Sequence, residues 1–350
     1  MDDYLVVGLG LAGIAFCHTL EQHGKSFRVI DSGFPGASKV AGGIYNPVVL
    51  KRLNRAWKAH EQLPLVGPFY DSLEQRLQAK FHYSLPVFRR FATPEEQNMW
   101  LDAADSPSLR PFLSGTLVPN QNPFLNAPHG LGEVRGTGRV DTGRLLETYR
   151  GYLQQRGCFH EEKFNYKTLR ISKDHMSYGA FKFDKLVFAT GFDAGNNPYF
   201  GHLPIQGNKG EYLEIHSPEL QLSGIIKGPV FLIPLGEDRY SVGATYSWKD
   251  HSPATTMDAR NYLKTKLDEL VNCSYRITGQ VAGIRPTVPD RRPLLGRHPL
   301  YKSIFILNGF GSRGVMLAPY AALQLFNLAE QEVPLDPEID ILRYQSLITP

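Results

Sequence analysis

A glycine-rich turn near the N-terminus limits most narrowly what this chain can fold into. Gly8, Gly10 and Gly13 form a Gly-x-Gly-x-x-Gly pattern between the apolar run 4–7 and helix-like sequence at 14–23. In a strand-turn-helix unit, the first glycine permits a tight turn and the second lets backbone approach a pyrophosphate, while the third lets helix and strand pack closely. A second apolar strand follows the helix. This order predicts a parallel, doubly wound sheet with helices on both faces that binds a dinucleotide.

Residues next to this turn are expected to hold the dinucleotide. Leu11 and Ala12 lie where the helix N-terminus presents free N–H groups and partial positive charge to phosphates. Asp31 ends the second strand, with Ser32 next to it, and a carboxylate there accepts hydrogen bonds from ribose hydroxyls and disfavours a 2′-phosphate. The alternative interpretation of Asp31 is a solvated aspartate at a strand end.

A stretch of small residues after the second strand favours FAD over NAD. It reads Pro35-Gly36-Ala37-Ser38 and then Ala41-Gly42-Gly43-Ile44. Such a segment can run close under a flat ring system without side chains in the way, which a nicotinamide enzyme needs less. The alternative interpretation is a plain flexible loop.

The rest of the chain alternates between two kinds of sequence. Segments 1–52, 139–205 and 285–350 carry buried-type strands that enter glycine turns, whereas 53–138 is aromatic and proline-rich and 206–284 alternates apolar with polar residues. We therefore predict an α/β (α+β) protein of two domains. A Rossmann-type FAD-binding domain, made by the first three segments, is interwoven with a substrate-binding domain on a mostly antiparallel sheet.

Composition limits the partners and the compartment. A formal charge of +4, from 38 basic and 34 acidic side chains, is too small to argue for nucleic acid. The three cysteines are widely spaced and form no Cys/His cluster, so neither a disulfide framework nor a metal site is expected. There is no apolar run long enough for a membrane span, and the chain enters its first strand without room for a signal peptide. We expect a cytoplasmic protein.

Motifs along nearly the whole chain resemble one flavoenzyme family. The segments, in order, are Gly36-Ala37-Ser38 with Ala41-Gly42-Gly43-Ile44, Val140-Asp141-Thr142, Phe188-Ala189-Thr190-Gly191, Lys209-Gly210-Glu211, Phe231-Leu232-Ile233-Pro234 with residues 242–246, Gly283-Ile284-Arg285-Pro286, and residues 309–319. They resemble the D-amino-acid oxidase family, which includes glycine oxidase and sarcosine oxidase. Two positions depart from its pattern: Thr142 replaces the usual proline, and Lys209-Gly210-Glu211 stands where Arg-Gly-Gln is common.

This resemblance implies a set of residues around non-covalently bound FAD. The cofactor contacts that it implies, beyond the first turn, are Ser38, Lys39, Ala41, Gly42, Gly43, Ile44, Phe164, Ala189, Thr190, Gly191, Gly309, Gly311, Ser312, Arg313, Gly314, Val315 and Met316. The helix after residue 314 is expected to point its N-terminus at the flavin pyrimidine and to stabilise negative charge there. Covalent attachment is not expected, because the nearest cysteine, Cys273, precedes Arg285.

Five side chains are candidates for the substrate site. Arg285 stands before a proline in a glycine-flanked turn, and its planar fork suits a substrate carboxylate, the role that the family resemblance implies; the alternative is an ion pair with an acid such as Asp290. Arg313 is a second contact for substrate or flavin, or else a surface arginine. The aromatic residues Tyr246, Phe231 and Tyr45 are expected to wall a small substrate, with core packing as the alternative.

The expected activity is oxidation of the carbon–nitrogen bond of a small amino acid or secondary amine, by hydride transfer to flavin, giving an imine. The electron acceptor is oxygen or another molecule. One alternative is a flavin domain acting on a glycine-like group of tRNA, a class of enzyme that the sequence at 311–314 also resembles. The basic run 51–58 suits contact with RNA phosphates, but a solvated basic face is the preferred interpretation of it. A second alternative is a dehydrogenase that passes electrons to a partner. The sequence does not identify the amine, the acceptor or the oligomeric state.

Overall fold

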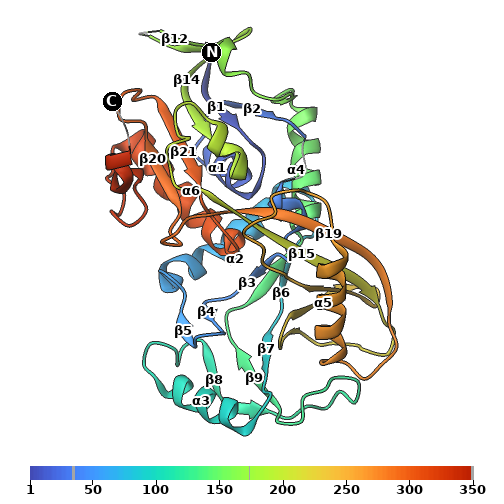
Figure 1. Ribbon diagram of the computed structural model, residues 1–350. Helices are drawn as coiled ribbons and strands as arrows, with labels where there is room; N and C mark the ends of the chain where they lie inside the picture. Colours follow the sequence, from blue (N-terminus) through green and yellow to red (C-terminus); the bar gives the residue numbers. More distant parts are fainter. Residues whose placement is uncertain (34–35, 173, 348–350) are drawn as a thin grey trace.

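The computed structural model describes residues 1–33, 36–172 and 174–347. Two large sheets lie one above the other in the view of Figure 1, and both chain termini lie at the end that carries the first sheet. Among the described residues, no helix combines the length and the apolar character needed to cross a membrane.

The first sheet is the predicted nucleotide-binding sheet. Its strands are β1 Asp2–Val7, β2 Phe27–Asp31, β11 Phe159–Glu161, β12 Leu169–Ile171, β13 Met176–Tyr178, β14 Phe181–Phe188, β20 Leu294–Arg297 and β21 Ile304–Asn308. The order is β11-β2-β1-β14-β13-β12, with β21 paired to β14 and β20 paired to β21. Strands β11, β2, β1, β14 and β21 run parallel, and β1 lies centrally, with Val6 opposite both Val29 and Val187. This arrangement confirms the α/β class.

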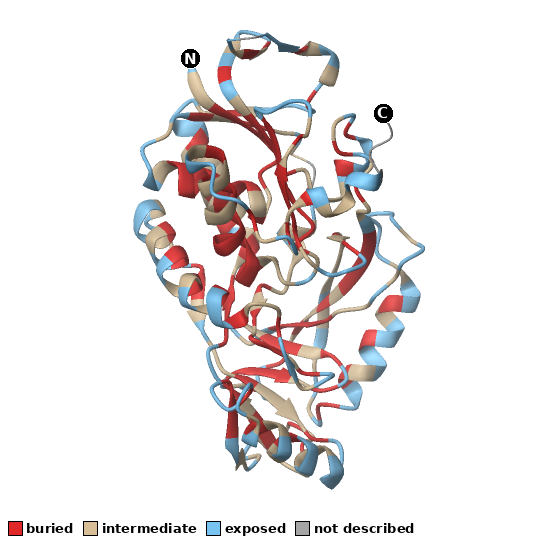
Figure 2. Cartoon of the chain, turned by 90° about the vertical axis from the view of Figure 1, so that its left-hand side faces the viewer, coloured by how far each residue is buried: buried red, intermediate tan, exposed pale blue. Residues whose placement is uncertain are grey.

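Four helices cover one face of this sheet. They are α1 Leu11–Gln22, α2 Ala59–Leu77, α4 Thr142–Gln155 and α6 Gly314–Gln331. Tyr4 and Val6 of β1 pack into a core with α1 and α6 residues such as Phe16 and Leu325. Figure 2 shows buried residues concentrated along these strands and helices.

The other face is covered differently from the prediction. Leu5 and Val7 of β1 pack against the β12–β13 hairpin and against irregular chain around Phe200 and Ile341. No α-helix contributes to this second core among the described residues. The 3-10 helices of the chain are η1 Ala37–Val40, η2 Tyr166–Thr168, η3 Gly191–Asn196 and η4 Ile341–Leu347. The expectation of α-helices on both faces was therefore wrong, although apolar cover on both faces explains why β1 is a continuous apolar run.

The second sheet confirms the expected mostly antiparallel substrate domain. Its strands are β7 Val87–Arg90, β8 Leu113–Val118, β9 Leu131–Val134, β15 Gln206–His216, β16 Ile225–Lys227, β17 Phe231–Gly236, β18 Arg239–Gly243 and β19 Arg276–Thr287. They follow the order β19-β15-β18-β17-β16-β7-β9-β8, and only β16 and β7 pair in parallel. Helix α5, Met257–Asp268, packs Leu263 and Leu267 on one side, and α3, Pro94–Asp105, buries Trp100 near the far end.

Short strands connect the two large sheets. They are β3 Ile44–Tyr45, β6 His82–Ser84 and β10 Gly138–Val140, which form one small sheet, and the pair β4 Val48–Val49 and β5 Asn54–Arg55. Helix α2 follows β5 and packs on α6 in the first core. The sequence predicted that all of residues 53–138 belong to the substrate domain. Because α2 packs in the first core, we propose instead that the domain boundary lies after α2.

Candidate active site

The glycine turn between β1 and α1 is closed by its neighbours. Gly8 has a φ of +102°, and a β-carbon there would meet the carbonyl oxygen of Ala189. A β-carbon on Gly13 would meet the carbonyl oxygen of Gly8, so the helix begins directly against the strand end. Gly10, at the helix N-cap, has no side-chain cap. The start of α1 therefore has the geometry expected of a phosphate-binding turn.

Asp31 fixes this turn from the end of the neighbouring strand. Its Oδ2 accepts a hydrogen bond from the N–H of Leu9 at 2.8 Å, and its Oδ1 accepts one from Gly33 at 2.9 Å. Arg150 places its Nη2 3.5 Å from Oδ1. Ser32 beside it is exposed. Because a carboxylate offers about four lone-pair positions, these contacts leave capacity for ribose hydroxyls.

The segment after β2 returns to the start of α1. The Ser38 hydroxyl accepts a hydrogen bond from the N–H of Leu11 at 3.1 Å, while the side chain of Lys39 is exposed. Pro35, at the beginning of the predicted small-residue stretch, lies outside the described residues. The contact of Ser38 with the helix start places η1 beside the phosphate-binding turn.

Gly42 and Gly43 lie where this segment passes between the two domains. Gly43 has a φ of +73°, and a β-carbon there would meet the carbonyl oxygen of Val140. A β-carbon on Gly42 would lie 2.7 Å from Cδ1 of Ile233 and 3.2 Å from the Tyr212 hydroxyl. Protein atoms therefore account for both glycines, whereas the sequence had suggested a ring system as the reason. Ala41 and Ile44 on either side are half-buried.

The end of β14 completes the nucleotide side. Ala189 donates its N–H to the carbonyl of Val7 at 2.8 Å, which holds the two turns side by side. The Thr190 hydroxyl is buried and has no hydrogen-bond partner among the described residues. Gly191 follows with a φ of +59°, and its carbonyl accepts a hydrogen bond from Asn308 at 2.9 Å. An unpaired buried hydroxyl beside a dinucleotide turn fits a bound ligand, since such groups are costly when left unsatisfied.

Phe164 lies elsewhere than its predicted role suggests. Its ring is buried, stacks on Tyr178 at 4.5 Å between centroids and meets Phe188 edge-on at 5.6 Å. The side chain belongs to the core under the sheet, and the contact of Phe164 with the cofactor stays a prediction. Only the backbone of Phe164 remains available for such a contact.

The second glycine turn joins the end of β21 to α6 and meets the substrate domain. Gly309 and Gly311 have φ values of +77° and +54°, and Gly311 donates its N–H to the carbonyl of Pro286 at 2.9 Å. Val315 is buried, and its carbonyl accepts a hydrogen bond from Tyr70 at 2.8 Å. Ser312 is exposed, Gly314 begins the helix, and Met316 packs in the first core. The turn therefore brings the α6 N-terminus next to the end of β19.

Arg313 stands at the N-cap position of this helix, and its side chain makes no capping hydrogen bond. Its Nη1 donates to the carbonyl of Asn46 at 3.1 Å. Burial lowers the pKa of Arg313, and nearby Arg291 lowers it further. Arg313 has no carboxylate partner among the described residues, and it is half-buried, so the alternative of a fully exposed surface arginine does not hold.

Arg285 is the second cation of the site, and its side chain is buried. Asn208 lies opposite it in the β15–β19 ladder, and its Oδ1 accepts a hydrogen bond from the Arg285 Nη1 at 2.9 Å. The same Nη1 is 3.4 Å from the carbonyl oxygen of Thr245, and the guanidinium lies 4.8 Å from the ring centroid of Tyr246. The Nη2 group has no hydrogen-bond partner in the described part of the chain. The fork is thus held at one end and open at the other.

Asp290, the acid weighed as a structural partner of Arg285, is engaged elsewhere. Its Oδ2 accepts hydrogen bonds from Arg343 at 2.9 Å and from Tyr344 at 2.8 Å. Arg285 forms no ion pair with any carboxylate of the described residues. Since buried charges are normally paired, an unpaired buried guanidinium points to an anionic ligand.

The predicted aromatic residues divide into two groups. Tyr246 is 66% exposed beside Arg285, and Phe231 is half-buried on the same sheet, as a substrate wall requires. Tyr45, by contrast, is buried in the first core, and its hydroxyl lies 3.0 Å from Nε2 of His82. Burial raises the pKa of Tyr45 to about 12. We therefore place Tyr45 in the core and no longer in the substrate wall.

Two functional positions were missed by sequence reasoning. The Nδ2 group of Asn208 is buried beside Arg285 without a partner in the described residues. Gly210 leaves the space that the Arg285 guanidinium occupies. The only feature of the sequence that points to these positions is the family-like motif at 209–211, and the motif alone gives no role to its glycine.

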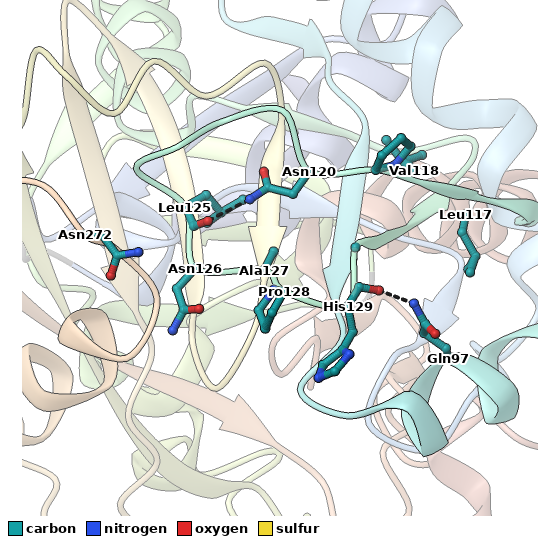
Figure 3. A pocket seen from close by; sticks show the side chains of 12 residues that line it. Gln97, Leu117, Val118, Asn120, Leu125, Asn126, Ala127, Pro128, His129 and Asn272 are labelled. Atoms are coloured by element: carbon teal, nitrogen blue, oxygen red, sulfur yellow. Dashed lines mark hydrogen bonds between the residues drawn. The ribbon is translucent and has the colours of Figure 1, made fainter.

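A separate hollow is lined by other residues. Figure 3 shows it from close by: Asn120 donates to the carbonyl of Leu125 at 2.7 Å, and Gln97 donates to that of His129. Its volume is about 740 Å³. It shares no lining residue with the site around Arg285, and in the described residues no cluster of His, Cys, Asp and Glu suited to a metal ion occurs anywhere.

Comparisons with known proteins agree with this geometry. A family model described as "FAD dependent oxidoreductase" matches residues 3–328. The glycine oxidase of Pseudomonas aeruginosa is 25% identical over 95% of this chain and 96% of its own length. A tRNA 5-methylaminomethyl-2-thiouridine biosynthesis bifunctional protein of Marinobacter nauticus is 25% identical over 92% of this chain, which spans only 54% of that protein. The crystal structure of a glycine oxidase from Bacillus cereus matches with a TM-score of 0.79 and 18% identity, covering 95% of this chain and 96% of that one.

Proposed function

This chain belongs to the D-amino-acid oxidase family of FAD-dependent oxidoreductases, and we propose that it oxidises the carbon–nitrogen bond of an amine that carries a carboxylate. A small amino acid or an N-substituted glycine has this chemistry. The single observation that carries the proposal is the open Nη2 end of buried Arg285, which has no protein carboxylate to neutralise it among the described residues.

The substrate carboxylate is proposed to bind between Arg285 and Asn208. A guanidinium fork binds a carboxylate with two parallel hydrogen bonds, which fixes both its position and its orientation. The unpaired Nδ2 of Asn208 supplies a further donor beside the fork. Tyr246 covers the guanidinium at 4.8 Å and confines the ligand from the solvent side.

The two cations, Arg285 and Arg313, also favour the neutral form of the substrate amine. Oxidation requires the amine in its neutral form, and positive charges near an ammonium group lower its pKa. Arg285 is buried, Arg313 is half-buried, and both lack a carboxylate partner among the described residues, so their charges act at short range in a poorly solvated site. The amine is therefore expected to lose its proton to solvent before it reacts.

FAD, when bound, supplies the acceptor for the hydride that leaves the substrate α-carbon. The turn residues Gly8, Gly10 and Gly13, with Asp31 and the unpaired hydroxyl of Thr190, are proposed to hold its nucleotide part. The substrate residues lie on the second sheet, so the protein's contribution is to hold the α-carbon against the cofactor in one orientation.

A second candidate function acts on the same group in a larger molecule. The relative from Marinobacter nauticus is named for the biosynthesis of a modified tRNA uridine, and this chain spans about half of its length. An N-substituted glycine attached to a nucleotide offers Arg285 the same carboxylate. The acceptor, whether oxygen or a partner, is a further open choice within either proposal.

Anaerobic reduction of the bound flavin tests the proposal. Purified protein is mixed without oxygen with glycine, sarcosine, D-amino acids, larger N-alkylglycines and the decarboxylated amine of each. Bleaching of flavin absorbance by carboxylate-bearing amines, and not by their decarboxylated partners, is the expected result. Equal bleaching by both members of each pair, or by neither, would contradict it. Admission of oxygen then separates an oxidase, which releases peroxide, from a dehydrogenase.

A further inference from the structure

We infer that the substrate carries a second negative group, and that Lys227, Arg89 and Lys51 bind this group at the outer end of the substrate wall. The inference rests on the proposed function, because it extends the same substrate site along the same sheet. It makes the substrate larger than a free amino acid.

The register of the second sheet places these residues in one row. Tyr212 and Phe231 both lie opposite Gly243, Phe231 lies opposite Lys227, and Lys227 lies opposite Arg89. Directly paired residues of neighbouring strands project from the same face of a sheet. The row therefore begins at the aromatic wall of the substrate site and ends in two cations.

That face is the one turned toward the cofactor domain. Alternation along β15 puts Asn208 and Gly210 on the same face as Tyr212, and Arg285 shares it through its pairing with Asn208. A β-carbon on Gly283 of this face would meet Val40 of η1, which belongs to the cofactor domain. Arg285 and Lys227 thus project from the same face of the sheet.

Lys227 forms no ion pair with any acidic residue in the described part of the chain. Its Nζ lies 4.8 Å from the ring centroid of Phe231 and donates to the carbonyl of its neighbour Gly228 at 2.8 Å. Arg89 binds Glu96 of α3 at 3.0 Å, and exposed Lys51 has no ion pair among the described residues. Three cations with one carboxylate leave a net positive cluster beside the substrate wall.

The burial of Lys227 beside two other cations changes its pKa. Burial lowers the pKa of Lys227 to about 8, and the charges of Arg89 and Lys51 contribute to the same shift. A lysine held in this way destabilises the fold unless an anion joins it. An oxyanion bound among the three cations neutralises them and returns the pKa of Lys227 toward its usual value.

The distance between the two anion-binding groups limits the substrate. Lys227 and Arg285 lie four strands apart in the order β16-β17-β18-β15-β19, and Arg285 stands four residues beyond Val281, the residue that lies opposite Tyr212. Strand spacings of about 4.8 Å and rises of about 3.3 Å per residue put their Cα atoms about 23 Å apart. The Arg285 guanidinium lies over Gly210, and the Lys227 Nζ lies 4.8 Å from the ring centroid of Phe231. Gly210 and Phe231 are two strands and two residues apart, which puts the two charges roughly 10 Å from each other. No free small amino acid spans that distance.

The substrate class that fits is an N-substituted glycine whose other arm ends in an oxyanion. The carboxylate of its glycine part binds Arg285, and its distal phosphate or carboxylate binds the Lys227 cluster. A phosphate on a nucleotide-sized arm and a carboxylate on an aliphatic arm present the same chemistry to these cations. The experiment below distinguishes the two.

Direct anion binding is measured first, with inorganic sulfate as the probe because its charge is constant between pH 7 and pH 9.5. Calorimetry on the holoenzyme is expected to show that Lys227→Gln weakens binding by about 10-fold or more, the effect of losing a charge-assisted contact. Lys182→Gln, an exposed lysine on β14, serves as the control and is expected to leave binding unchanged. Equal affinity in the wild type and in Lys227→Gln would overturn the inference.

The pH dependence gives a second, independent readout. Wild-type affinity for sulfate is expected to fall as the pH rises through about 8, where Lys227 loses its proton. Lys227→Arg keeps its charge, so its affinity is expected to stay constant across this range. The other charged groups that face the site are Arg89, Lys51 and Glu96, and all three are present in both proteins. A parallel fall in both proteins would contradict the assignment to Lys227.

Substrate preference then separates this inference from the proposed function. N-alkylglycines with a terminal phosphonate, carboxylate or hydroxyl about 10 Å from the glycine carboxylate are compared with sarcosine. We expect a kcat/KM at least about 10-fold higher for one anionic arm than for the hydroxyl arm, and loss of that preference in Lys227→Gln, with the rate on sarcosine retained. Equal values for all three arms would overturn the second subsite and leave the proposed function standing. Failure of every compound, sarcosine included, to reduce the flavin would instead refute the proposed function.

Discussion

The guanidinium of Arg285 occupies the space beside Gly210 in which any other residue would place its β-carbon. The two residues lie on neighbouring strands, because Asn208 pairs with Arg285 and Gly210 pairs with Gly283. A glycine in the interior of a strand often marks such a close approach. The position of the Arg285 guanidinium therefore depends on the absence of a side chain at Gly210.

Gly210→Ala is therefore expected to displace Arg285 without unfolding the protein, since the atoms that the new methyl group meets are the mobile end of an arginine side chain. We expect kcat/KM for a carboxylate-bearing amine to fall about 10- to 100-fold, the value of roughly 1.4 to 2.8 kcal/mol of transition-state stabilisation. FAD content and melting temperature should stay near wild type. A variant that loses FAD or unfolds, with normal kinetics in the folded fraction, would contradict this account.

Asn208→Asp tests whether the free Nη2 end of the Arg285 guanidinium binds an anion. The substitution keeps the shape of the side chain and places a carboxylate 2.9 Å from the Arg285 Nη1, so the protein supplies the anion that the substrate should supply. KM for carboxylate-bearing amines is expected to rise at least about 10-fold, while binding of FAD is unchanged. Asn208→Ala is the comparison: a similar rise in KM with alanine would attribute the effect to lost support of Arg285.

Asp31→Ala is expected to weaken FAD binding. The change removes the acceptor of the Leu9 and Gly33 N–H groups and the proposed partner of the ribose, a loss of about 1 to 3 kcal/mol, or roughly 5- to 150-fold in Kd. Flavin fluorescence during titration of the apoprotein measures the Kd. Asp184→Ala, an exposed aspartate on β14, is the control. Equal Kd values in the three proteins would remove Asp31 from the cofactor site.

Lys227→Met is expected to stabilise the protein at neutral pH. The folded pKa of Lys227 is about 8, below its usual 10.5, so the unfolded chain binds more protons between these values and stability rises with pH there. Removing the buried charge should raise the free energy of unfolding by about 1 to 3 kcal/mol at pH 7. The gain should shrink from pH 8 to pH 10.5. The measurement is urea denaturation of both proteins at several pH values, with Lys182→Met as the control. A gain in stability that is absent, or that does not change with pH, would contradict this prediction.

The first sheet and its glycine turn were readable from the sequence because their signals are local. The run Tyr4 to Val7 and the glycines that follow it are adjacent in the chain, and the structure places them as a strand and a turn beside Asp31. Helix α2 is harder to recognise in the sequence. Its first half contains Pro64 and Pro68, which are poor helix formers away from the first turn.

The details of the substrate site were not readable, because they depend on pairings between distant segments. Nothing local indicates that Gly210 makes room for Arg285, or that Asn208 lies opposite it, since both facts follow from the register of β15 and β19. Tyr45 was misjudged for the same reason. Its neighbours in the sequence favour a site next to the flavin, but its hydroxyl contacts His82 in the first core. Phe164 likewise turned out to pack under the sheet.

The central claim, that Arg285 holds a substrate carboxylate for FAD-dependent oxidation, is tested most directly by stopped-flow flavin reduction in wild type and Arg285→Ala, with an amino acid and its decarboxylated amine as a matched pair. Loss of a charge-assisted, bidentate contact of about 2 to 4 kcal/mol should lower kcat/KM for the amino acid roughly 30- to 1000-fold. The amine should react at nearly the wild-type rate, and Arg285→Lys should restore only part of the loss. Equal losses for both substrates would mean that Arg285 supports the fold or the cofactor, and would contradict the claim.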